Sequence, residues 1–263
     1  MKNFLVAVLA IGCAAILFTG YLHWNDKTVV STAKGNQEVE STETEKTTSA
    51  KKPNQNLKEL TANWPEQARE QYKQSLDTEE PFNILIAGSN ALGYEEEGWS
   101  VQLKNQLEEA FGDTIQVAVK SYDLTSAQFI LENKLDELIA KKPDLTLLEP
   151  FTLNDNGKVQ LADSHLQIKE IAAGLMEENP EHVLLLQPPY PLHQAIYYPK
   201  EVEALKDFAE DNDIPYLDHW TAWPDPDSDE ILEYLTEENG STYVNENGHQ
   251  LWANYLRDYF IAK

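Results

Sequence analysis

One serine of this chain stands where a hydroxyl group could act as a nucleophile. Ser89 lies in the stretch ILIAGSNALG, residues 84–93, directly after a short apolar run and Gly88. The apolar run predicts a buried strand, and the Gly-Ser-Asn sequence predicts a turn that lifts the hydroxyl out of the sheet. A serine so placed can attack an acyl carbon if a base lies within hydrogen-bond reach. The same sequence is also common in ordinary turns, so Ser89 needs support from the rest of the chain.

The composition restricts which nucleophiles and which partners the folded domain can have. The only cysteine, Cys13, lies in an apolar N-terminal run, so a disulfide framework and a thiolate metal site are excluded from the folded domain. A nucleophile there must be an oxygen or a nitrogen. With 45 Asp and Glu residues against 20 Lys and Arg, the formal net charge is −25, which argues against nucleic acid and anionic membrane surfaces as main partners.

The N-terminal part predicts an anchor and a linker. Residues 4–24 contain no Asp, Glu, Lys or Arg, and as a helix they would span the roughly 30 Å hydrocarbon core of a bilayer. We interpret residues 1–24 as an uncleaved membrane anchor, with a cleaved signal segment or lipidation at Cys13 as the alternatives. Lys2 favours an extracytoplasmic location for the domain. Residues 25–57 are rich in Ser, Thr, Glu and Lys, which predicts a disordered linker.

From residue 58 onward, short apolar runs alternate with amphipathic stretches. This alternation is typical of parallel strands covered by helices on both faces, so we expect residues 58–263 to form one α/β domain. The predicted architecture is a three-layer α/β/α sandwich around a five-stranded, mainly parallel sheet. The predicted strands are 83–88, 114–120, 144–150, 182–188 and 214–218, and the predicted helices are 64–76, 99–111, 126–142, 161–179, 199–212 and 247–263.

Polar residues follow several of the predicted strands. Ligands of such sheets bind beyond the carboxyl ends of the strands, where Ser89, Asp123 and Asn154 would gather. Loops rich in aromatic residues and proline, 187–199 and 219–230, follow the last two strands and predict either a pocket or a hydrophobic cover. A flavodoxin-like domain for a phosphate ligand is a weak alternative, because the sequence has no Gly-rich phosphate loop.

The residues at these strand ends resemble the SGNH (GDSL) hydrolase superfamily, over essentially the whole region from about residue 80 to 263. The resemblance rests on AGSNALG after the first strand, EPFTLNDNG after the third, and YVNENGHQLWANYL near the C-terminus. It implies the flavodoxin-like fold of that family and an extracytoplasmic, Gram-positive-type member. It also implies that Ser89 is the nucleophile, and that the Ser89 backbone N–H and the Asn154 side-chain amide stabilise the oxyanion. Without the resemblance, the turn at Asn154 would be interpreted as a loop cap.

Two motifs depart from the pattern of that family. The second block, KSYDLTSAQF, has no glycine, and Thr125 or a neighbour stands where the family places an oxyanion donor. Alignment of VNENGH with the family's C-terminal block puts Tyr243 at the catalytic histidine and Gly240 at the acid, which would leave the triad broken. Glu246-x-x-His249 is the alternative, because it keeps a carboxylate three residues before a histidine.

We therefore expect His249 to be the general base and Glu246 to orient its ring. The competing interpretation is structural, with Glu246 as a charge at a helix N-terminus and His249 packing on the domain. His219, which follows the fifth predicted strand, is the reserve base.

These residues together predict a membrane-tethered, extracytoplasmic, lipase-like serine esterase that cleaves an ester (O-acyl) bond. Its substrate would be an acylated small molecule, glycan or lipid, and we expect a monomer with no metal and no organic cofactor. A single span through residues 4–24 would hold it in the cell membrane, with a secreted protein or a lipoprotein as the alternative localisation. The alternative function is a catalytically impaired protein of the same fold that binds a cell-envelope glycan.

Overall fold

Parallel strands form a central sheet in the order β2-β1-β3-β4. This computed structural model describes residues 54–93 and 98–263. The predicted α/β fold with a mainly parallel sheet is confirmed, and a strand is present at each of the first four predicted positions. The strands are β1 (Phe82–Ser89), β2 (Ile115–Tyr122), β3 (Leu145–Glu149) and β4 (Val183–Leu186).

The fifth predicted strand, 214–218, is reduced to one parallel bridge between Leu186 and Tyr216. Leu186 N donates to Pro215 O at 2.9 Å, and Leu217 N donates to Leu186 O at 2.8 Å. Pro215 has no N–H of its own and cannot extend the ladder. The prediction of a five-stranded sheet is therefore corrected to four strands and a bridge.

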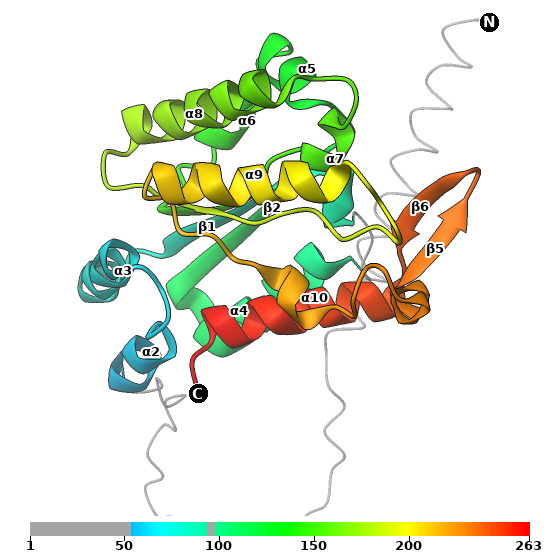
Figure 1. The fold of residues 1–263 in the computed structure, drawn as a ribbon. Coiled ribbons are helices and arrows are strands. Elements are labelled where there is room, and N and C mark those ends of the chain that lie inside the picture. Colours follow the sequence, from blue (N-terminus) through cyan, green and yellow to red (C-terminus); the bar gives the residue numbers. More distant parts are fainter. Residues whose placement is uncertain (1–53, 94–97) are drawn as a thin grey trace, which may run out of the picture. The chain divides into compact units, whose positions relative to one another are not determined.

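The side chains of the strands alternate between two hydrophobic layers. In β1, Ile84 and Ile86 pack into one layer, whereas Leu85 and Ala87 pack into the other, as expected for a parallel sheet covered on both faces. One layer includes residues of α2 (Asn54–Leu60), α3 (Glu66–Thr78), α4 (Trp99–Phe111) and α10 (Glu246–Phe260), and the other includes residues of α5 (Ser126–Leu131), α6 (Leu135–Ile139), α8 (Leu161–Glu178) and α9 (Tyr198–Asp211). Figure 1 shows α8 and α9 on one side of the sheet and α4 and α10 on the other.

One helix was not predicted, and one predicted helix is divided. Helix α2 begins at Asn54, inside the segment predicted as a linker, because Leu57 is buried in the hydrophobic layer that also contains residues of α3, α4 and α10. The predicted helix 126–142 is divided into α5 and α6, because Asn133 adopts a left-handed φ of 53° between them.

An antiparallel hairpin precedes α10 and was not predicted. Its strands are β5 (Leu235–Glu238) and β6 (Ser241–Val244), and the turn residues Asn239 and Gly240 have φ values of 53° and 79°. Asn-Gly is the favoured sequence for such a turn, so the signal was present in the chain.

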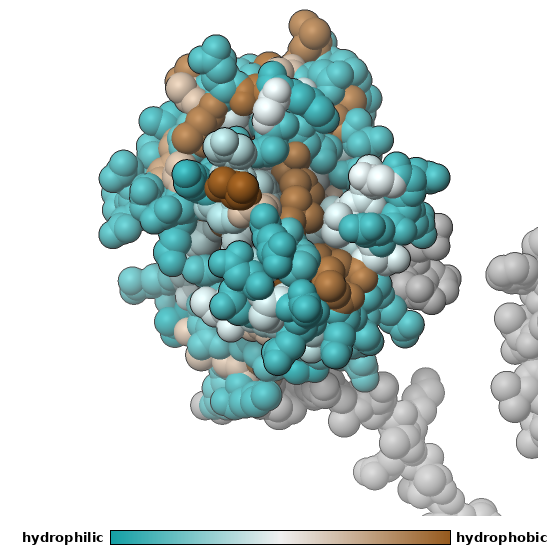
Figure 2. Space-filling model, turned by 45° about the vertical axis from the view of Figure 1, so that its right-hand side comes forward, coloured by the Kyte–Doolittle hydropathy of each residue, from teal (hydrophilic) through white to brown (hydrophobic). Residues whose placement is uncertain are grey.

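The predicted membrane span, residues 4–24, lies outside the described residues. Within 54–93 and 98–263, none of the helices is both long enough and apolar enough to cross a bilayer. Figure 2 shows a largely hydrophilic face with scattered apolar groups, in keeping with the strongly acidic composition.

Candidate functional site

Ser89 is the last residue of β1, which lies between β2 and β3 in the sheet. Its side chain caps the short 3-10 helix η1 (Asn90–Leu92), because Oγ accepts a hydrogen bond from Ala91 N at 3.1 Å. Ser121 Oγ, on β2, donates to the Ser89 carbonyl oxygen at 2.9 Å. Ser89 has an exposed fraction of 0%, so an ester can reach the hydroxyl only after covering groups shift.

A carboxyl group that the sequence analysis did not single out lies against this serine. Glu149 ends β3, is fully buried, and accepts the backbone N–H of Ser89 at Oε2 over 2.7 Å. Burial raises the pKa of Glu149 to about 7; the polar groups of Ser89 act in the opposite direction, and the charge of Asp155 raises it. Glu149 Oε1 is buried and has no hydrogen-bond partner among the described residues.

The close contact between the two strand ends depends on a glycine. Gly88 is paired with Glu149 across the sheet, and a β-carbon on Gly88 would lie 2.5 Å from the Glu149 carbonyl oxygen. Only glycine therefore permits this approach. Two residues after Glu149, the buried Phe151 has a left-handed φ of 56°, a conformation that costs of order 1–3 kcal/mol outside glycine and is enriched at functional sites.

Asn154 lies at the same edge of the sheet, in the short helix α7 (Thr152–Asp155). Its Nδ2 donates to Leu124 O at 2.9 Å, and the amide nitrogen carries a second hydrogen that can still serve an oxyanion. The next residue, Asp155, is buried and accepts from Ser126 N and Ser164 Oγ, each at 2.8 Å. The Asn-Asp pair therefore connects α7 to the loop after β2, to α5 and to α8.

The other two predicted oxyanion donors are backbone N–H groups that already have partners. Thr125 is the N-cap of α5, and its N–H donates to Gln128 Oε1 at 2.9 Å within a capping box. The Ser89 N–H donates to Glu149. Because a backbone N–H carries one hydrogen, neither group can stabilise an oxyanion unless its present bond breaks.

His249 lies in the first turn of α10, next to the loop that follows β1. Its Nδ1 accepts the N–H of Trp99 at 3.3 Å, so the proton of the neutral ring is on Nε2. Burial lowers the pKa of His249 to about 4. Glu246 is exposed, and no hydrogen bond joins His249 to Glu246 or to Ser89 within the described part of the chain. The catalytic role of Glu246 and His249 stays a prediction.

Comparisons with known proteins connect this arrangement to a fold. No protein-family model matches the chain, and no curated protein matches it. Among solved structures, a candidate lipolytic protein of the G-D-S-L family from Desulfitobacterium hafniense is 19% identical, with a TM-score of 0.53 over 67% of this chain and 98% of that chain. A catalytic mutant of an acetylxylan esterase from Geobacillus stearothermophilus is 14% identical, with a TM-score of 0.52 over 68% and 94%. The chain has the SGNH hydrolase fold.

Within this SGNH fold, the reserve base His219 is part of the core. Its exposed fraction is 0%, its Nε2 is bonded to Pro188 O at 2.8 Å, and its Nδ1 accepts from Trp223 Nε1 at 3.0 Å. Burial lowers the pKa of His219 to about 3. Because both ring nitrogens have partners in the interior, His219 has no nitrogen free for a substrate.

The two residues aligned with the family's acid and histidine lie on the hairpin. Gly240 is in the turn between β5 and β6, and Tyr243 is on β6 with a partly exposed side chain. Neither residue type is a carboxylate or an imidazole, so the usual C-terminal acid and base are absent from these positions.

A cavity of about 510 Å³ adjoins the end of β1. Tyr190 OH donates to Thr242 O at 2.7 Å and connects the 187–199 loop to the hairpin beside this cavity. Trp223, in the other aromatic loop, is instead buried in the hydrophobic layer that contains residues of α4 and α10. The lining includes Asn90, Ala91, Gly93, Gly98, Tyr190, Thr236, Glu238, Tyr243, Val244, Asn245, Glu246 and His249.

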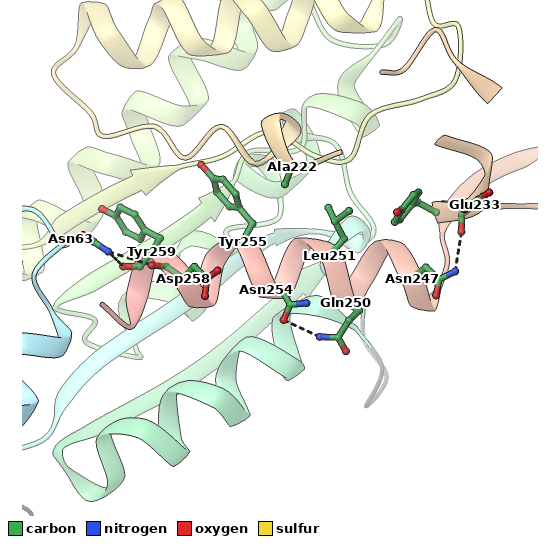
Figure 3. A pocket seen from close by; sticks show the side chains of 11 residues that line it. Asn63, Ala222, Glu233, Asn247, Gln250, Leu251, Asn254, Tyr255, Asp258 and Tyr259 are labelled. Carbon is green, nitrogen blue, oxygen red and sulfur yellow. Dashed lines mark hydrogen bonds between the residues drawn. The ribbon is translucent and has the colours of Figure 1, made fainter. Parts of the chain in front are cut away.

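A larger open groove, of about 930 Å³, runs along α10. Figure 3 shows Tyr255 and Tyr259 on one side of this helix and Asn254 and Gln250 on another, with Gln250 Nε2 donating to Asn254 Oδ1 at 3.2 Å. None of the predicted catalytic residues lines the groove, so its size alone does not make it the active site. Within the described residues, no cluster of three or more His, Cys, Asp or Glu side chains could hold a metal ion.

Proposed function

We propose that this protein is an ester hydrolase of the SGNH type in which Ser89 is the nucleophile. The observation that carries the proposal is the junction of β1 and β3, where Ser89 bonds to the buried carboxyl group of Glu149 and the next two residues, Asn90 and Ala91, line a cavity of about 510 Å³. A serine hydroxyl needs a proton acceptor nearby, and the buried carboxyl group of Glu149, which already accepts the Ser89 backbone N–H, can supply one. The fold shared with the esterase and lipase structures supports this assignment.

Asn154 is the oxyanion donor that this arrangement leaves available. One of its amide hydrogens is held by Leu124 O, which fixes the plane of the amide. The second hydrogen stabilises the charge that develops when Ser89 attacks the acyl carbon, an effect worth roughly 3–4 kcal/mol for a well-placed donor.

The substrate is an O-acyl ester of a small molecule, a glycan or a lipid. Its cavity lies within the roughly 300–1,000 Å³ range of small-molecule pockets. Tyr190 and Tyr243 in its lining offer aromatic surface for an acyl chain or a sugar ring. The uncharged run at residues 4–24 supports a membrane-tethered enzyme with an extracytoplasmic domain.

The test is hydrolysis of p-nitrophenyl acetate by the purified full-length chain. Ser89→Ala should lower the rate to background, whereas Ser75→Ala, on α3, where the hydroxyl donates to Tyr72 O at 2.9 Å, should stay within about threefold of wild type. Circular dichroism of both variants controls for folding. Equal rates for wild type and Ser89→Ala would reject the hydrolase assignment.

A second candidate is a catalytically impaired protein that binds a cell-envelope glycan. It is favoured by the burial of Ser89, by the occupied N–H groups of Ser89 and Thr125, and by Tyr243 at the usual histidine position. In that case the wild-type chain would not hydrolyse the ester faster than Ser89→Ala, but it would sediment with purified peptidoglycan, and Tyr243→Ala would weaken that association.

A further inference from the structure

We propose that Glu149 is the general base that activates Ser89, in the place that a histidine holds in related enzymes. This inference rests on the proposed ester hydrolase function and adds a catalytic residue to it. Glu149 lies directly against the proposed nucleophile, since its Oε2 accepts the backbone N–H of Ser89 at 2.7 Å.

The geometry around the serine hydroxyl favours proton transfer to this carboxyl group. Ser89 Oγ accepts the N–H of Ala91 at 3.1 Å, so its own proton is free to be donated. The Ser89 N–H holds Glu149 Oε2 at 2.7 Å, and this bond fixes the carboxyl group beside the hydroxyl. Glu149 Oε1 has no partner in the described part of the chain, and a buried polar atom without a partner calls for a chemical explanation.

The surroundings of Glu149 disfavour the ionised form of its carboxyl group. Asp155 in α7 acts on Glu149 as a like charge. Burial raises the pKa of the Tyr198 phenol on α9, and the charge of Glu149 raises it further. None of the ion pairs between described residues includes Glu149. A carboxylate without a cationic partner is a stronger proton acceptor than an exposed glutamate, as a general base requires.

The proposed reaction needs no reactant other than the ester and water. Glu149 takes the Ser89 proton while Oγ bonds to the acyl carbon, and it returns that proton to the leaving alkoxide as the ester C–O bond breaks. Water then attacks the acyl-serine and gives a proton to Glu149, and the proton returns to Ser89 Oγ as the carboxylic acid leaves. One ester and one water give one acid and one alcohol.

His249 is less suited to this role in the structure. Its Nδ1 accepts from Trp99 N, and Nε2 therefore carries the proton and cannot accept another. Its hydrogen bond is to the backbone of α4 and not to Ser89.

The pH dependence of hydrolysis separates the two bases. We would measure kcat/KM for p-nitrophenyl acetate between pH 5 and pH 9 with full-length wild type and Glu149→Gln, and subtract the Ser89→Ala rate at each pH. The wild-type rate should rise through an inflection near the Glu149 pKa of about 7. Glu149→Gln should be at least about 10²-fold slower and should lack the inflection.

Asp144→Asn is the matched control, because Asp144 makes the same kind of bond at the opposite end of β3, with Oδ2 accepting the N–H of Asn83 at 2.7 Å. It should keep the inflection and a rate within about threefold of wild type. If Glu149→Gln does not fold, the wild-type profile still decides, since a flat profile from pH 5 to pH 9, as expected for a base with the His249 pKa of about 4, overturns the inference.

Failure of this inference is distinct from failure of the proposed function. If Ser89→Ala is inactive while Glu149→Gln keeps the wild-type rate and inflection, the hydrolase function stands and Glu149 is not the base. If the wild type is no faster than Ser89→Ala at any pH, the function itself is rejected and the base with it.

Discussion

The strand β3 has a carboxyl group at each end, and the two ends differ in what that group can do. Asp144, just before the strand, accepts the N–H of Asn83 at 2.7 Å, and Glu149, at its last position, accepts the N–H of Ser89 at 2.7 Å. Both bonds join β3 to β1. At the level of this hydrogen bond the two ends are equivalent.

The carboxyl groups of Asp144 and Glu149 differ in their burial and in the groups around them. Asp144 is only partly buried, and burial raises its pKa while the Asn83 N–H lowers it. Glu149 is fully buried, one of its oxygens has no partner among the described residues, and its neighbour is a hydroxyl group. On our proposal, one strand places a structural carboxylate at its amino end and the general base at its carboxyl end, where ligands of parallel sheets bind.

The largest expected difference between Asp144 and Glu149 is in how each group makes the free energy of unfolding depend on pH. The folded-state pKa of Glu149 is raised from 4.5 to about 7, so this group favours the folded state below pH 4.5, and that contribution is lost as pH rises through about 7. The free energy of unfolding of Glu149→Gln should therefore gain roughly 3 kcal/mol relative to wild type between these limits. Urea titrations at several pH values measure it.

Asp144→Asn is again the control, and its gain should be smaller because Asp144 is partly solvated. Equal, pH-independent differences for the two variants would show that Glu149 is not destabilised by its burial, and would remove the distinction between the ends.

The next effect concerns the two asparagines that flank β3. Asn154→Ala should lower turnover of p-nitrophenyl acetate by roughly 10²-fold, because it removes an oxyanion donor while leaving Ser89 in place. Asn179→Ala should leave turnover within about threefold, since the Asn179 side chain bonds only at the amino end of β3 and beside α8: Nδ2 donates to Pro143 O and Asp144 Oδ1, each at 3.5 Å, and Oδ1 accepts from Glu181 N at 3.1 Å. A similar loss of turnover in both variants, accompanied by a lower melting temperature, would instead assign Asn154 to turn capping.

A smaller effect is expected at His249. With Glu149 as the base, His249→Ala should lower kcat by less than about tenfold and should reduce stability by about 1 kcal/mol, because the Trp99 N–H loses its acceptor. Steady-state kinetics and thermal unfolding of the same preparation measure both quantities. A loss of activity as complete as that of Ser89→Ala would return the role of base to His249.

The smallest effect is expected at Tyr243, which lies in the cavity lining with a partly exposed ring. Tyr243→Phe keeps the ring and removes the hydroxyl, so it should change KM by less than about threefold and leave kcat unaltered. A large loss of kcat would show that the phenol takes part in the reaction.

The sequence predicted most of the fold because both faces of the sheet are covered. The short apolar run 83–88, which ends at a turn sequence, fits a strand buried on both sides, and the amphipathic run 99–111 coincides with α4. The prediction was wrong where one residue changes the backbone, as at Pro215, which limits pairing to a bridge, and at Asn133, which separates α5 from α6.

The site was predicted only in part. Ser89 and Asn154 follow apolar runs, so their places at the strand ends could be read from the chain. Glu149 was missed because its contact with Ser89 depends on the register that pairs it with Gly88, and nothing in the local sequence shows this pairing. Likewise, the bond between His249 and Trp99 depends on the packing of α10 against α4.

The central claim is that Ser89 is a reactive nucleophile despite its burial. The most direct measurement is intact-protein and peptide mass spectrometry of the full-length chain after incubation with a fluorophosphonate at pH 8. We predict one adduct, on Ser89, absent from Ser89→Ala and formed at least about 10²-fold more slowly in Glu149→Gln than in Asp144→Asn. No adduct on Ser89, or labelling that is equal in wild type and Ser89→Ala, would contradict the account.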